Sequence, residues 1–159
     1  MNDTAAIRRM QLADLPRVME IELESFTMPW SEMTFRGLLR RSDTDLFVAE
    51  ADGRLVGYAV FWAVLEEGEL GNVSVASDYR RRGIGGILVE TVLKRAAERG
   101  VRDVYLEVRV SNVGAQELYS RFGFEQVGRR RNYYVQPVED AFVMRKRLNT
   151  TPLPRQENC

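Results

Sequence analysis

A short run of arginines and glycines between two regular segments constrains this chain more than any other feature. Residues Tyr79–Gly86 read Y-R-R-R-G-I-G-G. The residues before them, Leu70–Val75, have the composition of a β-strand, and apolar residues recur at every fourth position through Ile84–Arg99, which predicts an amphipathic helix. Glycines let backbone N–H groups approach a ligand, and a helix N-terminus carries unpaired N–H groups with a partial positive charge. The segment predicts an anion site, with a solvated basic turn as the alternative.

The arginines in this segment favour phosphate as the anion, because their forked donors match phosphate oxygens. Two common phosphate motifs are nevertheless excluded. No Gly-Lys-Ser/Thr ends the glycine run, so it is not a Walker loop. The first strand lies far upstream and G-x-G-x-x-G is absent, so it is not a dinucleotide-binding fingerprint either.

Patterning along the rest of the chain predicts a mixed α/β domain in the order β-α-α-β-β-β-α-β-α-β-β. The expected strands are Ala5–Met10, Leu46–Ala51, Leu55–Leu65, Leu70–Val75, Val104–Val110, Phe124–Val135 and Asp140–Lys146. The expected helices begin with caps at Asp14, Ser31 and Asn112, or directly after the glycine run. The expected turns and helix ends are at Asp52-Gly53, Gly68, Gly100 and Gly123.

The composition bounds the chemistry. Among 159 residues there is no histidine, and the single cysteine, Cys159, is the last residue. A histidine triad, a histidine-ligated zinc and an internal disulfide are therefore excluded, and no metal is expected. The 23 basic and 23 acidic residues cancel, which disfavours bulk attraction to nucleic acid or membrane.

The length predicts one domain over residues 1–148, followed by a disordered tail at 149–159. We see neither a signal peptide nor an apolar run long enough to cross a bilayer. A cytoplasmic monomer is expected.

With these segments in view, the chain resembles the GCN5-related N-acetyltransferase (GNAT) superfamily, and within it the RimI-type acetyltransferases of ribosomal-protein N-termini. The Arg-Gly run matches the superfamily's acetyl-CoA pyrophosphate loop. The segments that match the subfamily are M-P-W-S (Met28–Ser31), N-V-S-V (Asn72–Val75), L-E-V-R-V-S-N (Leu106–Asn112), L-Y-S-R-F-G-F (Leu118–Phe124) and R-R-N-Y-Y (Arg130–Tyr134). The resemblance implies the GNAT fold, an α/β (α+β) mixed central sheet of about seven strands flanked by about four helices.

The resemblance implies that acetyl-CoA is the cosubstrate and that an amine attacks its thioester directly, without an acyl-enzyme. The acceptor would be a protein N-terminus, namely the N-terminal alanine of the eighteenth small-subunit ribosomal protein. An α-amino group has a pKa of about 7.7–8.0, against about 10.4 for a lysine side chain. Because such an acceptor is already partly neutral, a modest base suffices and histidine is dispensable.

Two residues are the catalytic candidates. Glu107 alternates with the apolar residues of its strand, and the resemblance makes it the base, acting through a water. Judged on its residues alone, it is equally an exposed strand residue paired with Arg109. Tyr119 is implied as the acid beside the thioester sulfur; without the resemblance, a core tyrosine is the better interpretation.

The expected cofactor contacts come from the strand before the glycine run, from the run itself and from one helix cap. They are Val73, Ser74, Val75, Arg80, Arg81, Arg82, Gly83, Ile84, Gly85, Gly86 and Asn112. In the family this strand splays from its neighbour, so that its backbone meets the pantetheine, and an amide near Val75 is the oxyanion donor. Gly71 would ease a bulge just before it. A plain core strand is the alternative.

Substrate preference is expected from two aromatic loops. Their acceptor-binding candidates are Met28, Trp30, Tyr133 and Tyr134, with Phe26 and Pro29 beside them. Core packing is the alternative for these side chains. Glu24 and Glu32 are possible attractors for a cationic amine.

Two competing functions remain open. One is a GNAT that acetylates another amine, such as a lysine side chain, a polyamine or an antibiotic. The other is a non-catalytic acetyl-CoA sensor or an RNA-binding module that uses the arginine runs. Zero net charge and the absence of an R-G-F-aromatic strand motif disfavour RNA as the main ligand.

Overall fold

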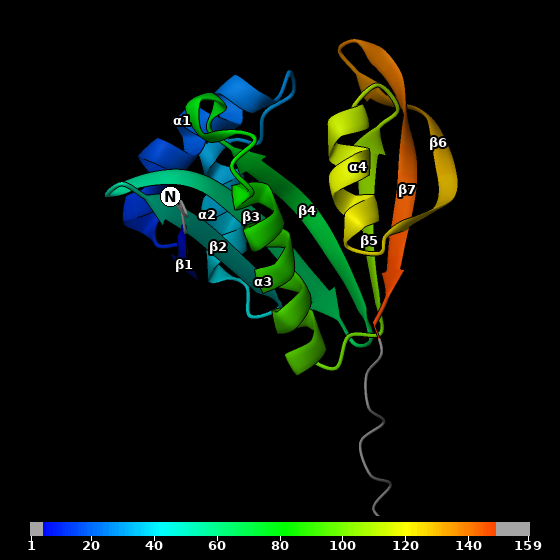
Figure 1. Ribbon diagram of the computed structural model, residues 1–159, viewed down its shortest axis with the longest axis horizontal. Helices are drawn as coiled ribbons and strands as arrows, with labels where there is room; N and C mark the ends of the chain where they lie inside the picture. The colour runs from blue at the N-terminus through cyan, green and yellow to red at the C-terminus, as the bar shows by residue number, and fades with distance from the viewer. Residues whose placement is uncertain (1–4, 149–159) are drawn as a thin grey trace, which may run out of the picture.

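A computed structural model describes residues 5–148 of the chain, which form one mixed sheet with helices on both faces (Figure 1). The strands are β1 (Ala6–Arg9), β2 (Thr44–Ala51), β3 (Arg54–Val64), β4 (Glu67–Val75), β5 (Asp103–Arg109), β6 (Glu125–Val135) and β7 (Val138–Arg147). The α-helices are α1 (Leu15–Ser25), α2 (Glu32–Arg40), α3 (Ile84–Glu98) and α4 (Val113–Arg121), and single 3-10 turns lie at Leu12–Asp14 and Ser77–Tyr79. The predicted element order and the fold class are confirmed.

The sheet has the order β1-β2-β3-β4-β5-β7-β6, and β4–β5 is its parallel pair. All other neighbouring strands run antiparallel. A parallel pair needs a crossover, and α3 provides it between β4 and β5. The Arg-Gly run therefore lies where the chain leaves the sheet at the end of β4 and enters α3.

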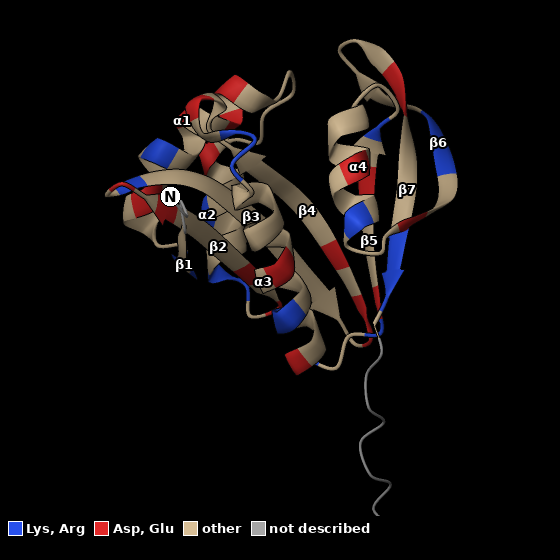
Figure 2. Ribbon diagram, in the orientation of Figure 1, with Lys and Arg blue, Asp and Glu red and all other residues tan. Residues whose placement is uncertain are grey.

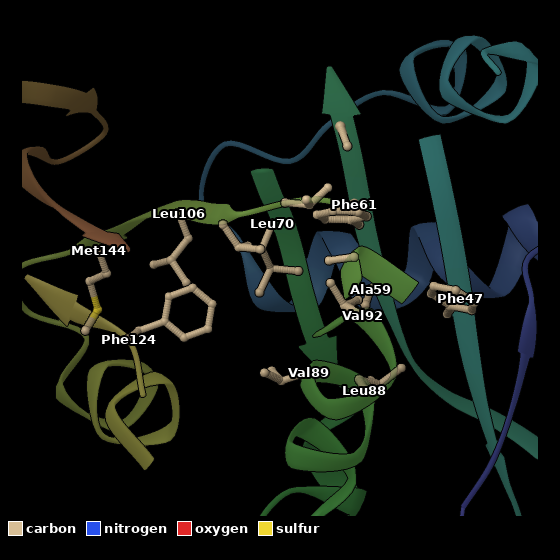
Figure 3. Close-up of a cluster of buried hydrophobic side chains, with 14 of the residues drawn as sticks. Phe47, Ala59, Phe61, Leu70, Leu88, Val89, Val92, Leu106, Phe124 and Met144 are labelled. Atoms are coloured by element: carbon tan, nitrogen blue, oxygen red, sulfur yellow. The ribbon is translucent and has the colours of Figure 1, made fainter. Parts of the chain in front are cut away.

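Two apolar clusters hold the layers together. The larger packs α3, with α4 at its margin, on one face of the sheet, and Figure 3 shows Leu88, Val89 and Val92 of α3 near Phe61 and Leu70. The smaller packs α1 and α2 on the opposite face through Val18, Ile21, Phe35 and Leu38. The two faces are distinct because side chains alternate along each strand.

Two local expectations are wrong. The turn before β4 is at Leu65-Glu66, where Leu65 has φ 55°, while Gly68 lies inside the strand. A Cβ at Gly68 would lie 2.6 Å from the Phe61 ring, so this glycine serves packing and not a turn. Asp14 does not cap α1, because its carboxylate accepts from Gln11 N and pairs with Arg8 at 2.7 Å.

Other local predictions are confirmed. Ser31 caps α2 by accepting from Thr34 N at 3.1 Å. Gly100 and Gly123 take left-handed φ values of 76° and 91° just past their helices. Tail residues 149–159 lie outside the described part of the chain.

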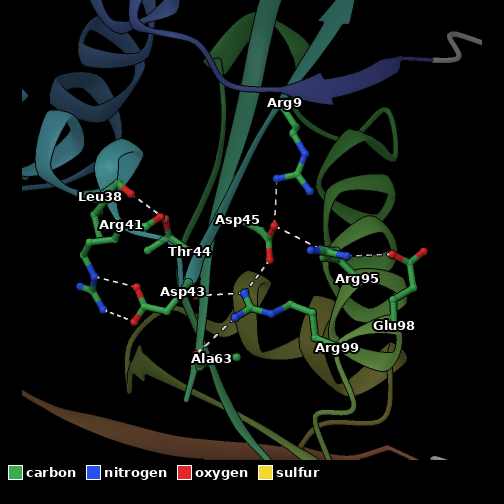
Figure 4. A network of polar contacts seen from close by, with 10 residues as sticks. All are labelled: Arg9, Leu38, Arg41, Asp43, Thr44, Asp45, Ala63, Arg95, Glu98 and Arg99. Atoms are coloured by element: carbon green, nitrogen blue, oxygen red, sulfur yellow. Dashed lines mark hydrogen bonds and ion pairs between the residues drawn. The ribbon is translucent and has the colours of Figure 1, made fainter. Parts of the chain in front are cut away.

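A polar network ties α3 to the edge of the sheet (Figure 4). Asp45 of β2 is 3% exposed and accepts from Arg9, Arg95 and Arg99 at 2.8, 3.2 and 2.8 Å. The negative charge of Asp45 is therefore buried together with positively charged partners, which offset the cost of removing it from water. None of the helices between residues 5 and 148 is both long and apolar enough to span a membrane.

Candidate active site

The central strands β4 and β5 separate along their length, as Figure 1 shows. Glu67–Glu69 pairs in parallel with Asp103–Tyr105, and beyond that point no residue of β4 pairs with β5 among the described residues. Leu70–Val75 keeps its pairing with β3 alone. This half of β4 therefore presents a row of backbone groups toward β5 that the sheet does not use, which is the kind of edge an extended ligand can join.

A bulge marks the position where the two strands part. Val60 is opposite Asn72 and Phe61 is opposite Leu70, so Gly71 is the extra residue. A Cβ at Gly71 would lie 2.4 Å from the Trp62 ring. The bulge expected from this glycine is confirmed, and the residue has to be small because indole rings pack on it.

The loop between β4 and α3 is basic and leaves the helix N-terminus open (Figure 2). Gly83 is the N-cap residue with φ 81°, and no side chain caps the helix. Arg81 also has a positive φ, 63°, and the three side chains of Arg80–Arg82 are exposed. Arg80 turns back to donate to Val75 O at 3.0 Å, and Arg82 lies 4.9 Å over the Tyr79 ring. The loop therefore combines positive charge with helix N–H groups that no side chain of its cap satisfies.

Glu107 faces away from α3 and α4. Its β5 neighbours Leu106 and Val108 are buried, while the Glu107 side chain is 24% exposed. Its ion-pair partner is Arg130 of β6 at 3.4 Å. The pairing with Arg109 considered from the sequence is wrong, because Arg109 pairs with Glu139 at 3.3 Å.

Tyr119 lies on α4, on the opposite side of the sheet from Glu107. Its ring meets Phe124 edge-on at 5.8 Å. Burial, with a smaller contribution from Tyr134, raises the pKa of Tyr119 to about 12. The hydroxyl therefore keeps its proton throughout the physiological range.

The last hairpin brings two tyrosines to the Glu107 side. Tyr133 and Tyr134 meet edge-on at 5.0 Å, and the Arg109 guanidinium lies 4.0 Å over the Tyr134 ring. Burial first, and then the neighbouring Tyr133, raise the pKa of Tyr134 to about 12, and Glu107 adds to the rise. Tyr134 is thus coupled electrostatically to both catalytic candidates.

The α1–α2 loop and the β6–β7 turn contact each other directly. Thr27 Oγ1 donates to Gln136 O at 2.7 Å, and Arg109 Nη2 donates to Thr27 Oγ1 at 3.0 Å. We call this set of contacts the loop bridge. It joins the two segments in which the sequence predicted the acceptor site.

Comparison with known proteins assigns this architecture. Residues 15–124 match the family model described as Acetyltransferase (GNAT) family. The chain belongs to the GNAT family.

Among curated members of the GNAT family, this chain is similar to acetyltransferases of a ribosomal protein. The ribosomal protein bS18-alanine N-acetyltransferase of Salmonella typhimurium is 39% identical over 137 residues, which is 85% of this chain and 92% of the relative. The protein of the same name from Escherichia coli K12 is 37% identical over 141 residues, which is 87% of this chain and 94% of the relative.

Solved structures agree with this grouping. The crystal structure of the Escherichia coli ribosomal-protein-S18-alanine N-acetyltransferase superposes with a TM-score of 0.86 at 33% identity, covering 96% of this chain and 98% of that one. The crystal structure of Ard1 from Thermoplasma volcanium superposes with a TM-score of 0.84 at 26% identity, covering 91% of this chain and 97% of that one.

The acceptor candidates of this GNAT chain divide by exposure. Trp30 is half-buried against Phe35 and Trp62, with ring centroids 5.6 and 6.3 Å away, while the Met28 side chain is 46% exposed. Each of the two suggested amine attractors already has a partner within the protein, and their role stays a prediction. Glu24 accepts from Ser77 N at 2.9 Å, and Glu32 pairs with Arg36 at 3.0 Å along α2.

Two of the expected cofactor contacts, Ser74 and Asn112, already use their side chains in hydrogen bonds within the protein. Ser74 is 7% exposed and its hydroxyl bonds to that of Ser25, so its side chain has little to offer a ligand. Asn112 caps α4 by accepting from Ala115 N at 3.1 Å. Between residues 5 and 148, no group of three or more His, Cys, Asp or Glu is arranged to hold a metal ion.

Sequence reasoning missed Glu69. Its register partner is Tyr105, two residues before Glu107 on the same face of the sheet. Burial raises the pKa of Glu69, and the charge of Glu107 raises it further. Strand alternation could have put Glu69 on the Glu107 face, but the β4–β5 register that brings the two close is not visible in the sequence.

Proposed function

We propose that this protein transfers the acetyl group of acetyl-CoA to the N-terminal α-amine of a protein, and that the acceptor is the N-terminal alanine of ribosomal protein bS18. The observation that carries the proposal is the position of Glu107, which lies on β5 where β4 departs from it. The substrate named for the relatives of high coverage supports the choice of acceptor. A ribosomal acceptor also implies that the reaction takes place in the cytoplasm.

The residues present fit acetyl-CoA, which supplies the activated acyl thioester. The open N-terminus of α3 and Arg80–Gly86 would bind the pyrophosphate. The edge of β4 that β5 leaves unpaired would hydrogen-bond the pantetheine arm through the backbone of Val73 and the N–H of Val75, since the Val75 carbonyl oxygen accepts from Arg80. An amide near Val75 would stabilise charge on the thioester carbonyl oxygen.

Glu107 acts as the general base, with a water as the carrier of the proton. An N-terminal amine loses its proton far more readily than a lysine side chain, so a carboxylate suffices for this acceptor. Arg130 orients the Glu107 carboxylate through their 3.4 Å contact. A lysine acceptor would instead require a stronger base or a higher pH.

Tyr119 interacts with the sulfur of the leaving group from the side of the sheet opposite Glu107. Its pKa of about 12 exceeds that of an ordinary thiol, about 8.5, so full proton transfer to the thiolate is uphill. The hydroxyl therefore acts as a hydrogen-bond donor to the developing thiolate. Solvent then completes its protonation.

The acceptor terminus approaches between the α1–α2 loop and the β6–β7 hairpin. Met28, Trp30, Tyr133 and Tyr134 would border this approach to Glu107. An approach between two loops suits a flexible chain end, while a polyamine lacks the peptide groups that could bond to the loops. This is why we prefer a protein N-terminus to a small amine.

The test is a mass-spectrometric assay with acetyl-CoA and a panel of three acceptors. The panel contains a peptide with the bS18 N-terminus, an N-terminally blocked peptide with an internal lysine, and spermidine. We expect acetylation of the first peptide at its α-amine and much slower reaction with the others. Preference for lysine or spermidine would assign another acceptor, and absence of turnover on all three would favour a sensor.

A further inference from the structure

Glu22 of α1 is a buried carboxylate to which the proposed chemistry assigns no task. It is 1% exposed, and among the described residues no Lys or Arg is one of its hydrogen-bond partners. An ionisable group without a counter-charge is costly to bury, so its hydrogen bonds must explain its presence. Burial raises the pKa of Glu22 above its usual range although those hydrogen bonds lower it.

The Glu22 carboxylate joins both sides of the site. It accepts from Trp30 N at 2.9 Å, in the loop that carries the acceptor candidates. It also accepts from Asn72 Nδ2, 3.1 and 3.2 Å from its two oxygens, at the bulge of β4. The Tyr58 hydroxyl of β3 donates to it from within the sheet.

These contacts converge where acceptor and donor meet. Asn72 directly follows the bulged Gly71 and directly precedes Val73, at the start of the β4 edge. A Cβ at Gly71 would lie 2.9 Å from the Trp30 ring, so loop and bulge also pack on each other. A single carboxylate thereby sets where the acceptor loop lies relative to the strand proposed to bind the donor.

We propose that Glu22 is a positioning residue that locks the Trp30 loop to the β4 bulge, and so aligns the acceptor amine with the thioester. This inference rests on the proposed function. An apolar residue of similar volume would avoid the desolvation cost of the carboxylate. It would also leave three donors unsatisfied and let the loop shift against β4, and a misplacement of about 1 Å can cost about 100-fold in rate.

The experiment compares Glu22→Met, Glu22→Gln and Asn72→Ala with the wild type. The acceptor is whichever panel member the wild type acetylates best, so the result does not depend on bS18 being the acceptor. Glu22→Met should raise the acceptor KM about tenfold and lower kcat, with the Kd of acetyl-CoA changed less than about twofold. Glu22→Gln keeps a carbonyl oxygen for Trp30 N and should recover most of the loss.

The matched control is Asp45→Asn. Asp45 is equally buried and hydrogen-bonded, but its partners Arg9, Arg95 and Arg99 lie outside the site (Figure 4). It should lower Tm while leaving KM and kcat unchanged below the melting range.

Three outcomes overturn the inference. The first is that Glu22→Met and Glu22→Gln lower Tm like Asp45→Asn with wild-type KM and kcat. The second is that Glu22→Gln is as impaired as Glu22→Met. The third is that Asn72→Ala adds its full effect on kcat/KM to that of Glu22→Met, since residues acting through one contact are non-additive. If the wild type acetylates none of the panel, the proposed function fails; faster amide hydrogen exchange at Trp30 in Glu22→Met but not in Asp45→Asn still tests the lock.

Discussion

The two ends of β4 differ in how they pair with the neighbouring strands. At Glu67–Glu69 the strand is bonded on both sides, to β3 and to β5, and behaves as ordinary sheet. From Leu70 to Val75 it is bonded to β3 alone, although it still lies in the middle of the sheet order. The same strand is therefore paired on both sides at one end and has an open edge at the other, which we propose binds the cofactor, with the Gly71 bulge between them. Changes at the open end should affect turnover and binding, and changes at the paired end should affect stability.

The largest expected effect is at Glu107, beside the open end. Glu107→Gln keeps the shape of the side chain but cannot take a proton, so kcat should fall about 100-fold. The Kd of acetyl-CoA, measured by calorimetry, should not change. The control is Glu67→Gln at the paired end, which should keep wild-type kcat. Normal turnover in Glu107→Gln would remove it as the base.

The next effect is at the N-terminus of α3. Gly85→Asp introduces a carboxylate where an anion is expected to bind, and the Kd of acetyl-CoA should rise about tenfold. Gly37→Asp makes the same exchange on α2, where a Cβ meets nothing within 4 Å, and should leave the Kd unchanged. Equal affinities in both variants would contradict the pyrophosphate assignment.

A loss of similar size is expected on the α4 side. Tyr119→Phe removes a hydrogen-bond donor to the thiolate but keeps the ring against Phe124, so kcat should drop about tenfold with Tm nearly unchanged. Tyr105→Phe at the paired end is the comparison and should remain fully active. Rates equal to wild type would leave Tyr119 as a packing residue.

The smallest effect concerns stability at the paired end. The pKa of Glu69 is raised in the folded state, chiefly by burial, so its ionised form disfavours folding. This cost is absent below the unfolded pKa of about 4.3 and fully present once pH exceeds the folded pKa. Glu69→Gln should therefore raise Tm at pH 7 by about 1–2 °C, because solvent screens much of the cost, and leave it unchanged near pH 4. A Tm gain that is the same at both pH values would show that charge is not the cause.

The sequence predicted the parts of the fold that depend on neighbours along the chain. Periodicity placed the strands and helices, and cap chemistry located Ser31 and Asn112, because these signals act over three or four residues. The Arg-Gly run marked the start of α3 for the same reason, and the anion site there stays a prediction. The resemblance then assigned roles that spacing alone left open, as with Tyr119.

What the sequence did not predict depends on contacts between distant segments. Glu22 gave no signal, because nothing along α1 shows that Tyr58 and Asn72 will bond to it. The nearby Arg109 was considered as a partner of Glu107 in the alternative interpretation, whereas the register of the last hairpin brings Arg130 to it. The turn predicted at Gly68 is also wrong, because this residue has to be small to leave room for the Phe61 ring and does not form a turn.

The loop bridge has a consequence for the order in which the protein becomes functional. It joins Thr27 to Gln136, 109 positions apart, so it closes when nearly the whole described chain is in place. Arg130, the partner of Glu107, arrives with the same hairpin. During synthesis the N-terminal segments fold first, and contacts of long sequence separation come last. A nascent chain that already contains the anion loop and Glu107 therefore still lacks a closed acceptor site, and competence as an enzyme awaits the final strands.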